Sequence, residues 1–171
     1  MKSVLANIVC ATLFFGGLTL AQSTTDQHLV PAANAKVEYV PVREYDPKRD
    51  AAADIKEAIA YAAQTHRRVL VEIGGKWCIW CTYLDKFFDR NESLRQFRDE
   101  NYVMVKVNFS PENKNEKVIS QYGGAPGYPH IVVLDADGKM LHAQDTSKLE
   151  EGRGYSVQAV LKFLEDWKPT R

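Results

Sequence analysis

The stretch Val-Leu-Val-Glu-Ile-Gly-Gly-Lys-Trp-Cys-Ile-Trp-Cys, residues 69–81, joins an apolar run to two closely spaced cysteines. Residues 69–73 are short, apolar and rich in β-branched side chains, which is typical of a strand buried on both faces. The pair Gly74–Gly75 ends this run, and the residues after the cysteines repeat with a helical period. The stretch therefore predicts a strand, a turn and a helix, with Cys78 and Cys81 at the start of the helix.

The N-terminus has the pattern of an export signal. One early lysine, an apolar segment and small residues before Ala21 predict a signal peptide over residues 1–21, cleaved after Ala21. A retained membrane anchor is the alternative, because the apolar segment is close to the ~18 residues that a span requires. Cys10 lies inside this segment, so the mature protein would carry only Cys78 and Cys81.

We expect the mature protein to be periplasmic, or secreted if its source is not bacterial, since disulfides persist outside the reducing cytosol. About 150 residues remain after the signal, enough for one domain with its own core. The chain has 22 basic and 22 acidic side chains, and no basic run suggests a nucleic-acid partner. We expect a monomer without a cofactor.

The rest of the chain divides into an arm and a domain. Residues 22–49 have no sustained periodicity and are interpreted as an extended N-terminal arm or linker. The domain, residues 50–171, contains a regular succession of helical and strand patterns. In order, we expect a helix ending near residue 66, a strand at 69–73, a helix after the cysteines, a short helix from 91, a strand at 102–108, a helix at 116–122, strands at 130–134 and 139–143, and a helix at 157–167.

This order predicts an α/β fold. Strands separated by helices favour parallel crossovers, and the Asp137–Gly138 turn favours an antiparallel hairpin near the end of the chain. Asn91 and Ser156 are predicted to cap the helices that follow them, and Val157 is predicted to face inward. The result would be a small mixed sheet with helices on both faces.

The cysteine pair by itself permits several chemistries. A zinc site needs about four ligands, and the histidines have no spacing that would complete one, so we expect no metal site. Two thiolates can hold Cu(I) with few other ligands, and a Cu(I)- or haem-maturation binding protein therefore stays an alternative. A structural disulfide would close too short a loop to add much stability.

A reactive dithiol has a positive physical argument. At the start of a helix, unpaired N–H groups and the helix dipole stabilise a thiolate, which favours Cys78 as the reactive thiol. Cys81 lies three residues later, within one helical turn, and can close on Cys78. The flanking Trp77 and Trp80 could cover the thiolate, form a docking surface or serve packing.

Residues 69–81 resemble the active-site segment of the thioredoxin superfamily, in which a strand, Trp-Cys-x-x-Cys and a helix occur in this order. Three further matches support the resemblance. Glu72 stands where the family carries a buried acid, Lys106 matches a lysine on the next strand that pairs with this acid, and Tyr128–Pro129 matches the cis-proline loop. The dipeptide Ile79–Trp80 and the bulky Tyr128 depart from the common patterns.

The resemblance, which is to periplasmic thioredoxin-like proteins, implies a thioredoxin fold and a thiol–disulfide oxidoreductase. It implies Cys78 as the nucleophile, Cys81 as the resolving thiol, Glu72 as the proton acceptor of Cys81, and Lys106 as the partner of Glu72. The side chains implied to contact substrate are Trp77, Trp80, Tyr128 and Pro129.

The implied partners are protein disulfides or dithiols and a redox partner, for which a membrane electron-transfer protein is one candidate. The direction of electron flow is left open by the resemblance. No histidine adds positive charge between the cysteines, and an acid lies behind them, which favours a reductant or mild exchanger over a strong oxidant.

Overall fold

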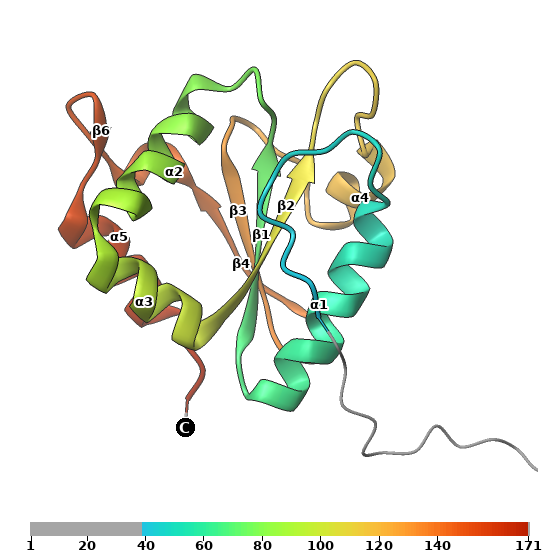
Figure 1. The fold of residues 1–171 in the computed structure, drawn as a ribbon, viewed down its shortest axis with the longest axis horizontal. Helices are drawn as coiled ribbons and strands as arrows, with labels where there is room; N and C mark the ends of the chain where they lie inside the picture. The colour runs from blue at the N-terminus through green and yellow to red at the C-terminus, as the bar shows by residue number, and fades with distance from the viewer. Residues whose placement is uncertain (1–38, 171) are drawn as a thin grey trace, which may run out of the picture. The chain divides into compact units, whose positions relative to one another are not determined.

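The apolar run at residues 69–73 forms the inner strand β1 (Arg68–Gly74) of a four-stranded sheet. Every residue of β1 after Arg68 is buried, which confirms a strand covered on both faces. Gly74 belongs to the strand and pairs with Asn108, so the chain turns one residue later than the glycine pair suggested. The computed structural model describes residues 39–170 (Figure 1).

The sheet has the order β2-β1-β3-β4. Strand β2 (Tyr102–Asn108) is parallel to β1, whereas β3 (His130–Leu134) is antiparallel to β1 and β4 (Met140–Asp145) is antiparallel to β3. The mixed sheet is therefore confirmed.

The expectation of a parallel crossover into β3 is wrong. The helix between β2 and β3 is α4 (Glu116–Gln121), which has only six residues. At 1.5 Å per residue such a helix is about 9 Å long, too short to carry the chain to the opposite end of a seven-residue strand. The chain thus enters β3 at the end where β2 finished, and His130 pairs with Ile73 near the carboxyl end of β1.

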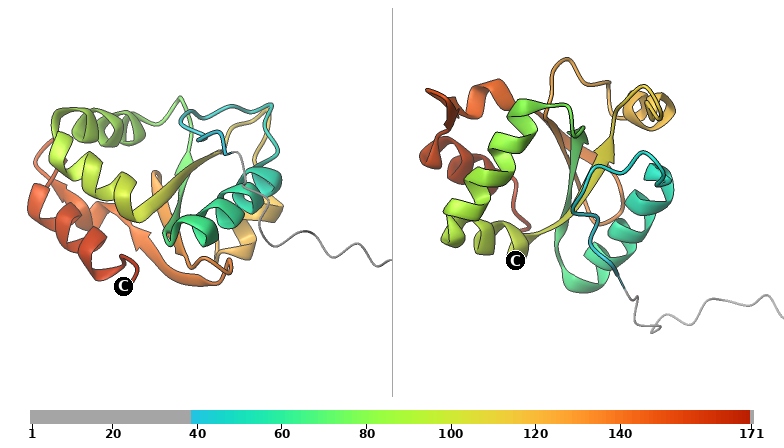
Figure 2. Two further views of the ribbon diagram at one scale, coloured as in Figure 1. Left: turned by 60° about the horizontal axis from the view of Figure 1, so that its bottom comes forward. Right: turned by 45° about the horizontal axis from the view of Figure 1, so that its top comes forward.

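Helices cover both faces of the sheet (Figures 1 and 2). Helices α1 (Ala51–Thr65) and α4 pack on the face that carries Val69, Val71 and Ile73. The other face, which carries Leu70, packs against helices in a second layer. That layer consists of α2 (Ile79–Arg90), α3 (Glu92–Asn101) and α5 (Val157–Asp166). Because side chains alternate along a strand, Glu72 lies on the same face as Leu70, towards α2.

The C-terminal part differs from prediction in detail. A 3-10 helix η1 (Thr146–Leu149) and a small hairpin of β5 (Glu150–Glu151) and β6 (Gly154–Tyr155) precede α5, and none of these was expected. Val157 was predicted to face inward, but it is exposed because the buried face of α5 runs through Val160, Phe163 and Leu164.

The two predicted helix caps are also wrong at the level of the side chain. Neither Asn91 nor Ser156 makes a side-chain capping hydrogen bond. The Asn91 amide instead donates to the carbonyl of Phe87, at the end of α2, over 2.7 Å. Asn91 follows α2 directly, and its backbone N–H donates to the same Phe87 carbonyl over 3.1 Å. Its side chain therefore adds a second hydrogen bond to the last turn of α2 and does not satisfy an N–H group of α3.

The last part of the predicted arm, residues 39–49, lies along the outer edge of β2. Val42 forms a parallel bridge with Val105, and the backbone N–H of Lys106 donates to the Val42 carbonyl over 3.1 Å. The Tyr39 hydroxyl donates to the carbonyl of Met104 over 3.0 Å. This segment therefore covers the backbone groups of an edge strand.

Residues 1–38 are outside the described part of the chain. The predicted signal peptide, residues 1–21, lies there, and so does most of the predicted arm. Within residues 39–170, no helix is both long enough and apolar enough to span a bilayer. The domain boundary at residue 50 stays a prediction.

Candidate active site

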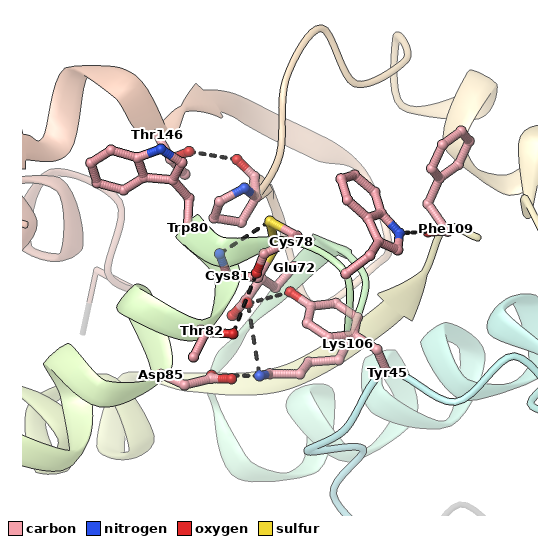
Figure 3. The surroundings of a disulfide bond; sticks show 12 residues. Tyr45, Glu72, Cys78, Trp80, Cys81, Thr82, Asp85, Lys106, Phe109 and Thr146 are labelled. Atoms are coloured by element: carbon pink, nitrogen blue, oxygen red, sulfur yellow. Dashed lines mark hydrogen bonds and ion pairs between the residues drawn. A yellow bond between two sulfur atoms is a disulfide. The ribbon is translucent and has the colours of Figure 1, made fainter. Parts of the chain in front are cut away.

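The two cysteines lie at the N-terminus of α2 and are joined by a disulfide bond (Figure 3). Cys78 is the N-cap residue, and its Sγ accepts a hydrogen bond from the backbone N–H of Cys81 over 3.1 Å. Both side chains are buried. The N–H groups at this helix end lack intrahelical partners, so in the reduced protein they favour the thiolate of Cys78.

Three aromatic side chains form what we call the outer rim: Trp77, Phe109 and Tyr128. The Trp77 indole N–H donates to the carbonyl of Phe109 over 2.6 Å, although 55% of this tryptophan is exposed. The Tyr128 ring meets Trp77 edge-on at 5.3 Å and stacks on Phe109 at 4.9 Å between centroids. The rim is thus an ordered aromatic surface next to the disulfide.

Trp80 has a different environment from Trp77. It is half-buried, and its ring meets Tyr83 and Tyr155 edge-on at centroid distances of 5.4 and 5.8 Å. The Tyr155 hydroxyl donates to the Trp80 carbonyl over 3.3 Å. This tryptophan therefore packs α2 against the β5–β6 hairpin, and its environment supports the packing interpretation.

Residues 128 and 129 bring a second chain segment to the disulfide. The peptide bond between Tyr128 and Pro129 is cis, and Pro129 is buried. The Thr146 hydroxyl donates to the carbonyl of Pro129 over 2.5 Å, which ties this loop to η1. Tyr128 also packs against the group formed by Tyr45, Cys78 and Cys81.

Behind the disulfide lie four polar side chains that we call the inner cluster: Tyr45, Glu72, Asp85 and Lys106 (Figure 3). Glu72 is 2% exposed, and its Oε1 accepts a hydrogen bond from the Tyr45 hydroxyl over 2.5 Å. Lys106 stands opposite Glu72 on the neighbouring strand, with its Nζ 3.8 Å from Oε1. The same ammonium is only 2.5 Å from Oδ1 of Asp85. Lys106 therefore bridges two carboxylates and is closer to Asp85.

Two members of the inner cluster, Glu72 and Tyr45, have shifted pKa values. Burial raises the pKa of Glu72, while the Lys106 charge and the hydrogen bond from Tyr45 act in the opposite direction. Burial, followed by the neighbouring Glu72 charge, raises the pKa of Tyr45 well above its ordinary value. The Tyr45 phenol consequently keeps its proton and acts as a donor to Glu72. A carboxyl group with a raised pKa can take a proton from a thiol and release it again.

A pocket of about 210 Å³ gives this region contact with solvent, and its lining includes Tyr45, Cys81, Asp85 and Lys106. Gly74 lies between Cys81 and Tyr45. A Cβ atom at Gly74 would be 2.5 Å from the Cys81 Sγ and 2.8 Å from the Tyr45 hydroxyl. The absence of a side chain at this position lets these two groups approach.

Sequence reasoning missed Tyr45 and Asp85. Tyr45 ends the run Tyr-Val-Pro-Val-Arg-Glu-Tyr at residues 39–45, whose aromatic and β-branched content could have indicated a strand-like segment. Asp85 follows Cys81 by four residues on a predicted helix, a spacing that puts both side chains on one face. Which strand would meet that face could not be read from the spacing.

Comparisons with known proteins agree with this geometry. Residues 50–136 match the family model described as Thioredoxin-like. A curated relative from Chlamydia pneumoniae, named disulfide bond reductase DsbH, is 30% identical over 94 residues, which cover 50% of this chain. The aligned part is 56% of that relative, so the chain spans about half the length of the curated protein that it matches.

Two solved structures are similar over most of the domain. The crystal structure of a disulphide isomerase from Xylella fastidiosa Temecula1 has 28% identity and a TM-score of 0.63, covering 74% of this chain and 97% of its own. The C-terminal domain of DsbD from Neisseria meningitidis has 18% identity and a TM-score of 0.52, covering 73% and 98%. The second likeness shows the fold alone. The predicted thioredoxin fold is confirmed, and the chain belongs to the thioredoxin-like family.

Proposed function

We propose that the protein is a thiol–disulfide oxidoreductase that reduces or exchanges disulfides of exported proteins through Cys78 and Cys81. The observation that carries the proposal is the position of Cys78, which caps α2 and forms a disulfide with Cys81 within the same first turn. The names of two relatives, a disulfide bond reductase and a disulphide isomerase, support the same reaction class.

The reaction begins on the outer side of the pair. The thiolate of Cys78, stabilised by the N-terminus of α2, attacks one sulfur of a substrate disulfide. The substrate S–S bond breaks, and its second sulfur leaves as a thiolate that takes a proton from solvent. Cys78 is then joined to the substrate by a mixed disulfide.

The inner side completes the exchange. The Cys81 thiol gives its proton to the carboxylate of Glu72, and the resulting thiolate attacks the Sγ of Cys78. The bond between Cys78 and the substrate breaks, the substrate sulfur leaves with the electron pair, and the Cys78–Cys81 disulfide forms. The substrate has gained two electrons, and a dithiol reductant must return the pair to its reduced state. A membrane electron-transfer protein is our candidate for that partner.

The outer rim is the proposed contact surface for the substrate chain. Trp77 is exposed and Tyr128 is partly exposed, so both offer aromatic area beside Cys78. Their edge-on contact and the stacking of Tyr128 on Phe109 hold this surface in place. Pro129 lies next to the sulfurs and, with Tyr128, offers backbone groups for strand-like pairing. Trp80 contributes through the packing of α2 against the hairpin.

The proposal also includes the location of the protein in the cell and the direction of electron flow through the cysteine pair. The N-terminal signal pattern, together with the relatives that carry Dsb names, supports an exported protein that works in the periplasm or outside the cell. We propose that the pair acts as a reductant, because an acid lies behind Cys81 and no cationic side chain separates the cysteines. A reduction potential near −120 mV, the strongly oxidising end of the scale, would contradict this direction.

The experiment is turnover of a disulfide-linked fluorescent peptide by the protein without its signal segment, in the presence of a dithiol. The wild-type protein should reduce the peptide catalytically, and Cys78→Ser should abolish turnover. Cys81→Ser should instead accumulate a covalent adduct between Cys78 and the substrate, visible by mass spectrometry after non-reducing separation.

Two outcomes would overturn the proposal. The first is wild-type turnover that survives in Cys78→Ser. The second is stoichiometric Cu(I) binding by the reduced pair without any turnover, which would favour the binding-protein alternative.

A further inference from the structure

Tyr45 belongs to a segment that the family match does not include. The matched region is residues 50–136, whereas Tyr45 lies in the segment along the outer edge of β2. Its side chain is nevertheless 4% exposed, packs with both cysteines, and points its hydroxyl at Glu72 (Figure 3). This chain has therefore placed a residue from its N-terminal segment at the centre of its redox site.

Tyr45 differs from Glu72 in that it lines the pocket behind the disulfide, whereas Glu72 does not. Cys81 and Lys106 line the same pocket. Lys106 is held by Asp85 at 2.5 Å and is 3.8 Å from Glu72. Within residues 39–170, the Tyr45 hydroxyl is thus the group that makes a direct hydrogen bond to the Glu72 carboxylate.

We propose that Tyr45 is a positioning residue for disulfide exchange: its hydroxyl holds the Glu72 carboxylate ionised and directed beside Cys81, and so sets the pH range in which Cys81 resolves the mixed disulfide. The inference rests on the proposed function for its kinetic consequence. Its structural part, the control of the ionisation of Glu72 by Tyr45, does not depend on that function.

The physical reason is the direction of the hydrogen bond. A hydroxyl that donates to a carboxylate stabilises the charged form, and in a buried site this contribution is larger than in water. Glu72 must be ionised to take the proton of Cys81. Without the donor, burial would keep more of the carboxyl protonated at neutral pH, and fewer molecules could deprotonate Cys81.

Other charges act on Glu72 and define what Tyr45 adds. The charges are those of Lys106 on β2, Asp85 on α2 and Arg98 on α3. The titratable Tyr155 on β6 also faces this region, and burial, helped by the Glu72 charge, raises its pKa. Lys106 and Arg98 favour the carboxylate, whereas Asp85 opposes it. Lys106 also pairs with Asp85, and Arg98 with Asp99 at 2.7 Å, so part of the cationic field is directed to other carboxylates. The Tyr45 hydroxyl, a neutral donor, adds stabilisation of the Glu72 carboxylate that these shared cations do not supply.

The test uses dithiobis-nitrobenzoate, a small aromatic disulfide that releases one coloured thiolate when Cys78 attacks and a second when Cys81 resolves. In Tyr45→Phe the first release should be unchanged. The second should be slower by about tenfold at mildly acidic pH, and its pH midpoint should move to higher pH, because a hydrogen bond to a charged group is lost. The matched control is Tyr39→Phe, which removes a hydroxyl bond from the same segment, to the carbonyl of Met104.

Two results would overturn the inference. In the first, Tyr39→Phe shifts the pH profile of the second release as much as Tyr45→Phe does, which would mean that the segment matters only as a covering strand. In the second, Tyr45→Phe slows the second release equally with and without Glu72→Gln, which would mean that the tyrosine does not act through Glu72.

An infrared titration separates this inference from the proposed function. The carboxyl band that disappears in Glu72→Gln should titrate at higher pH in Tyr45→Phe than in the wild-type protein, whether or not the protein turns over disulfides. An unchanged titration would contradict the inference even in a fully active enzyme. A shifted titration in a protein without exchange activity would contradict only the proposed function.

Discussion

The two sides of the Cys78–Cys81 disulfide are lined by different kinds of side chain. The outer rim is aromatic and partly exposed, and its order comes from ring contacts and one indole hydrogen bond. The inner cluster is polar and buried, and its order comes from two carboxylates, an ammonium and a phenol. In the proposed reaction, recognition of the substrate and movement of a proton therefore take place on opposite sides of one sulfur pair.

The two glycines after β1 show the same division at the level of the backbone. A Cβ atom at Gly74 would meet the Cys81 sulfur and the Tyr45 hydroxyl, which belong to the inner side. A Cβ atom at Gly75 would meet the Trp77 indole and lie 2.8 Å from the Phe109 carbonyl, both of the outer rim. The missing side chain at Gly74 therefore leaves space for the inner side of the site, and the missing side chain at Gly75 leaves space for the outer rim.

The largest effect should come from Glu72→Gln, which keeps the shape of the inner cluster but removes the proposed proton acceptor. The rate at which Cys81 resolves a mixed disulfide should fall by about 100-fold at neutral pH, since general base catalysis contributes about that much. The attack by Cys78 on a small aromatic disulfide should be nearly unchanged. Stopped-flow absorbance can follow both steps. If Glu72→Gln slowed the attack by Cys78 as much as the resolution by Cys81, the inner cluster would not act on Cys81 alone.

The same variant has a consequence for stability. Because burial raises the pKa of Glu72 above its ordinary value of 4.5, the folded protein binds this proton more tightly than the unfolded chain. The stability that this proton contributes is present below pH 4.5 and is lost as the pH rises through the folded pKa. The free energy of unfolding of the wild type, relative to that of Glu72→Gln, should therefore decrease over this interval in urea titrations at successive pH values. A constant difference would contradict the burial argument.

A smaller effect is expected from Gly74→Ala, which pushes a methyl group between the Cys81 sulfur and the Tyr45 hydroxyl. Overpacking at a buried site should lower the free energy of unfolding by about 1–3 kcal/mol, measured by chemical denaturation. Gly127→Ala is the matched control, because a Cβ atom there has nothing within 4 Å, and its effect should stay within about 0.5 kcal/mol. The prediction fails if the two alanine variants are equally stable.

The smallest effect should come from Trp77→Phe in the outer rim. This change keeps an aromatic ring but removes the indole bond to the Phe109 carbonyl, which is worth about 1 kcal/mol. We expect KM for a peptide disulfide to rise a few-fold, with kcat and the reaction of a small aromatic disulfide unchanged. Exposed Val157 on α5 is the control position, where Val157→Ser should leave KM unaltered. A fall in kcat would place Trp77 in the chemistry rather than in binding.

Much of the local structure could be predicted from the sequence. The inner strand, the helix after the cysteines and the Asp137–Gly138 hairpin all follow from periodicity and turn chemistry over short stretches. Cys78 at the start of α2 follows in the same way, because it depends only on where a helix begins. The direction of β3 could not be predicted from pattern, since it depends on whether a six-residue helix can cross the sheet.

The reactive groups of this protein can be identified from the chain alone: two cysteines one helical turn apart, an acid on the preceding strand and a lysine on the next. Their pairing, in contrast, depends on how distant segments pack in the folded domain. Lys106 lies closer to Asp85 than to Glu72, and the bond to Glu72 is made by Tyr45 from outside the family match. The physical reason is that periodicity fixes the face on which a side chain lies, whereas a hydrogen bond depends on which distant segment packs against that face.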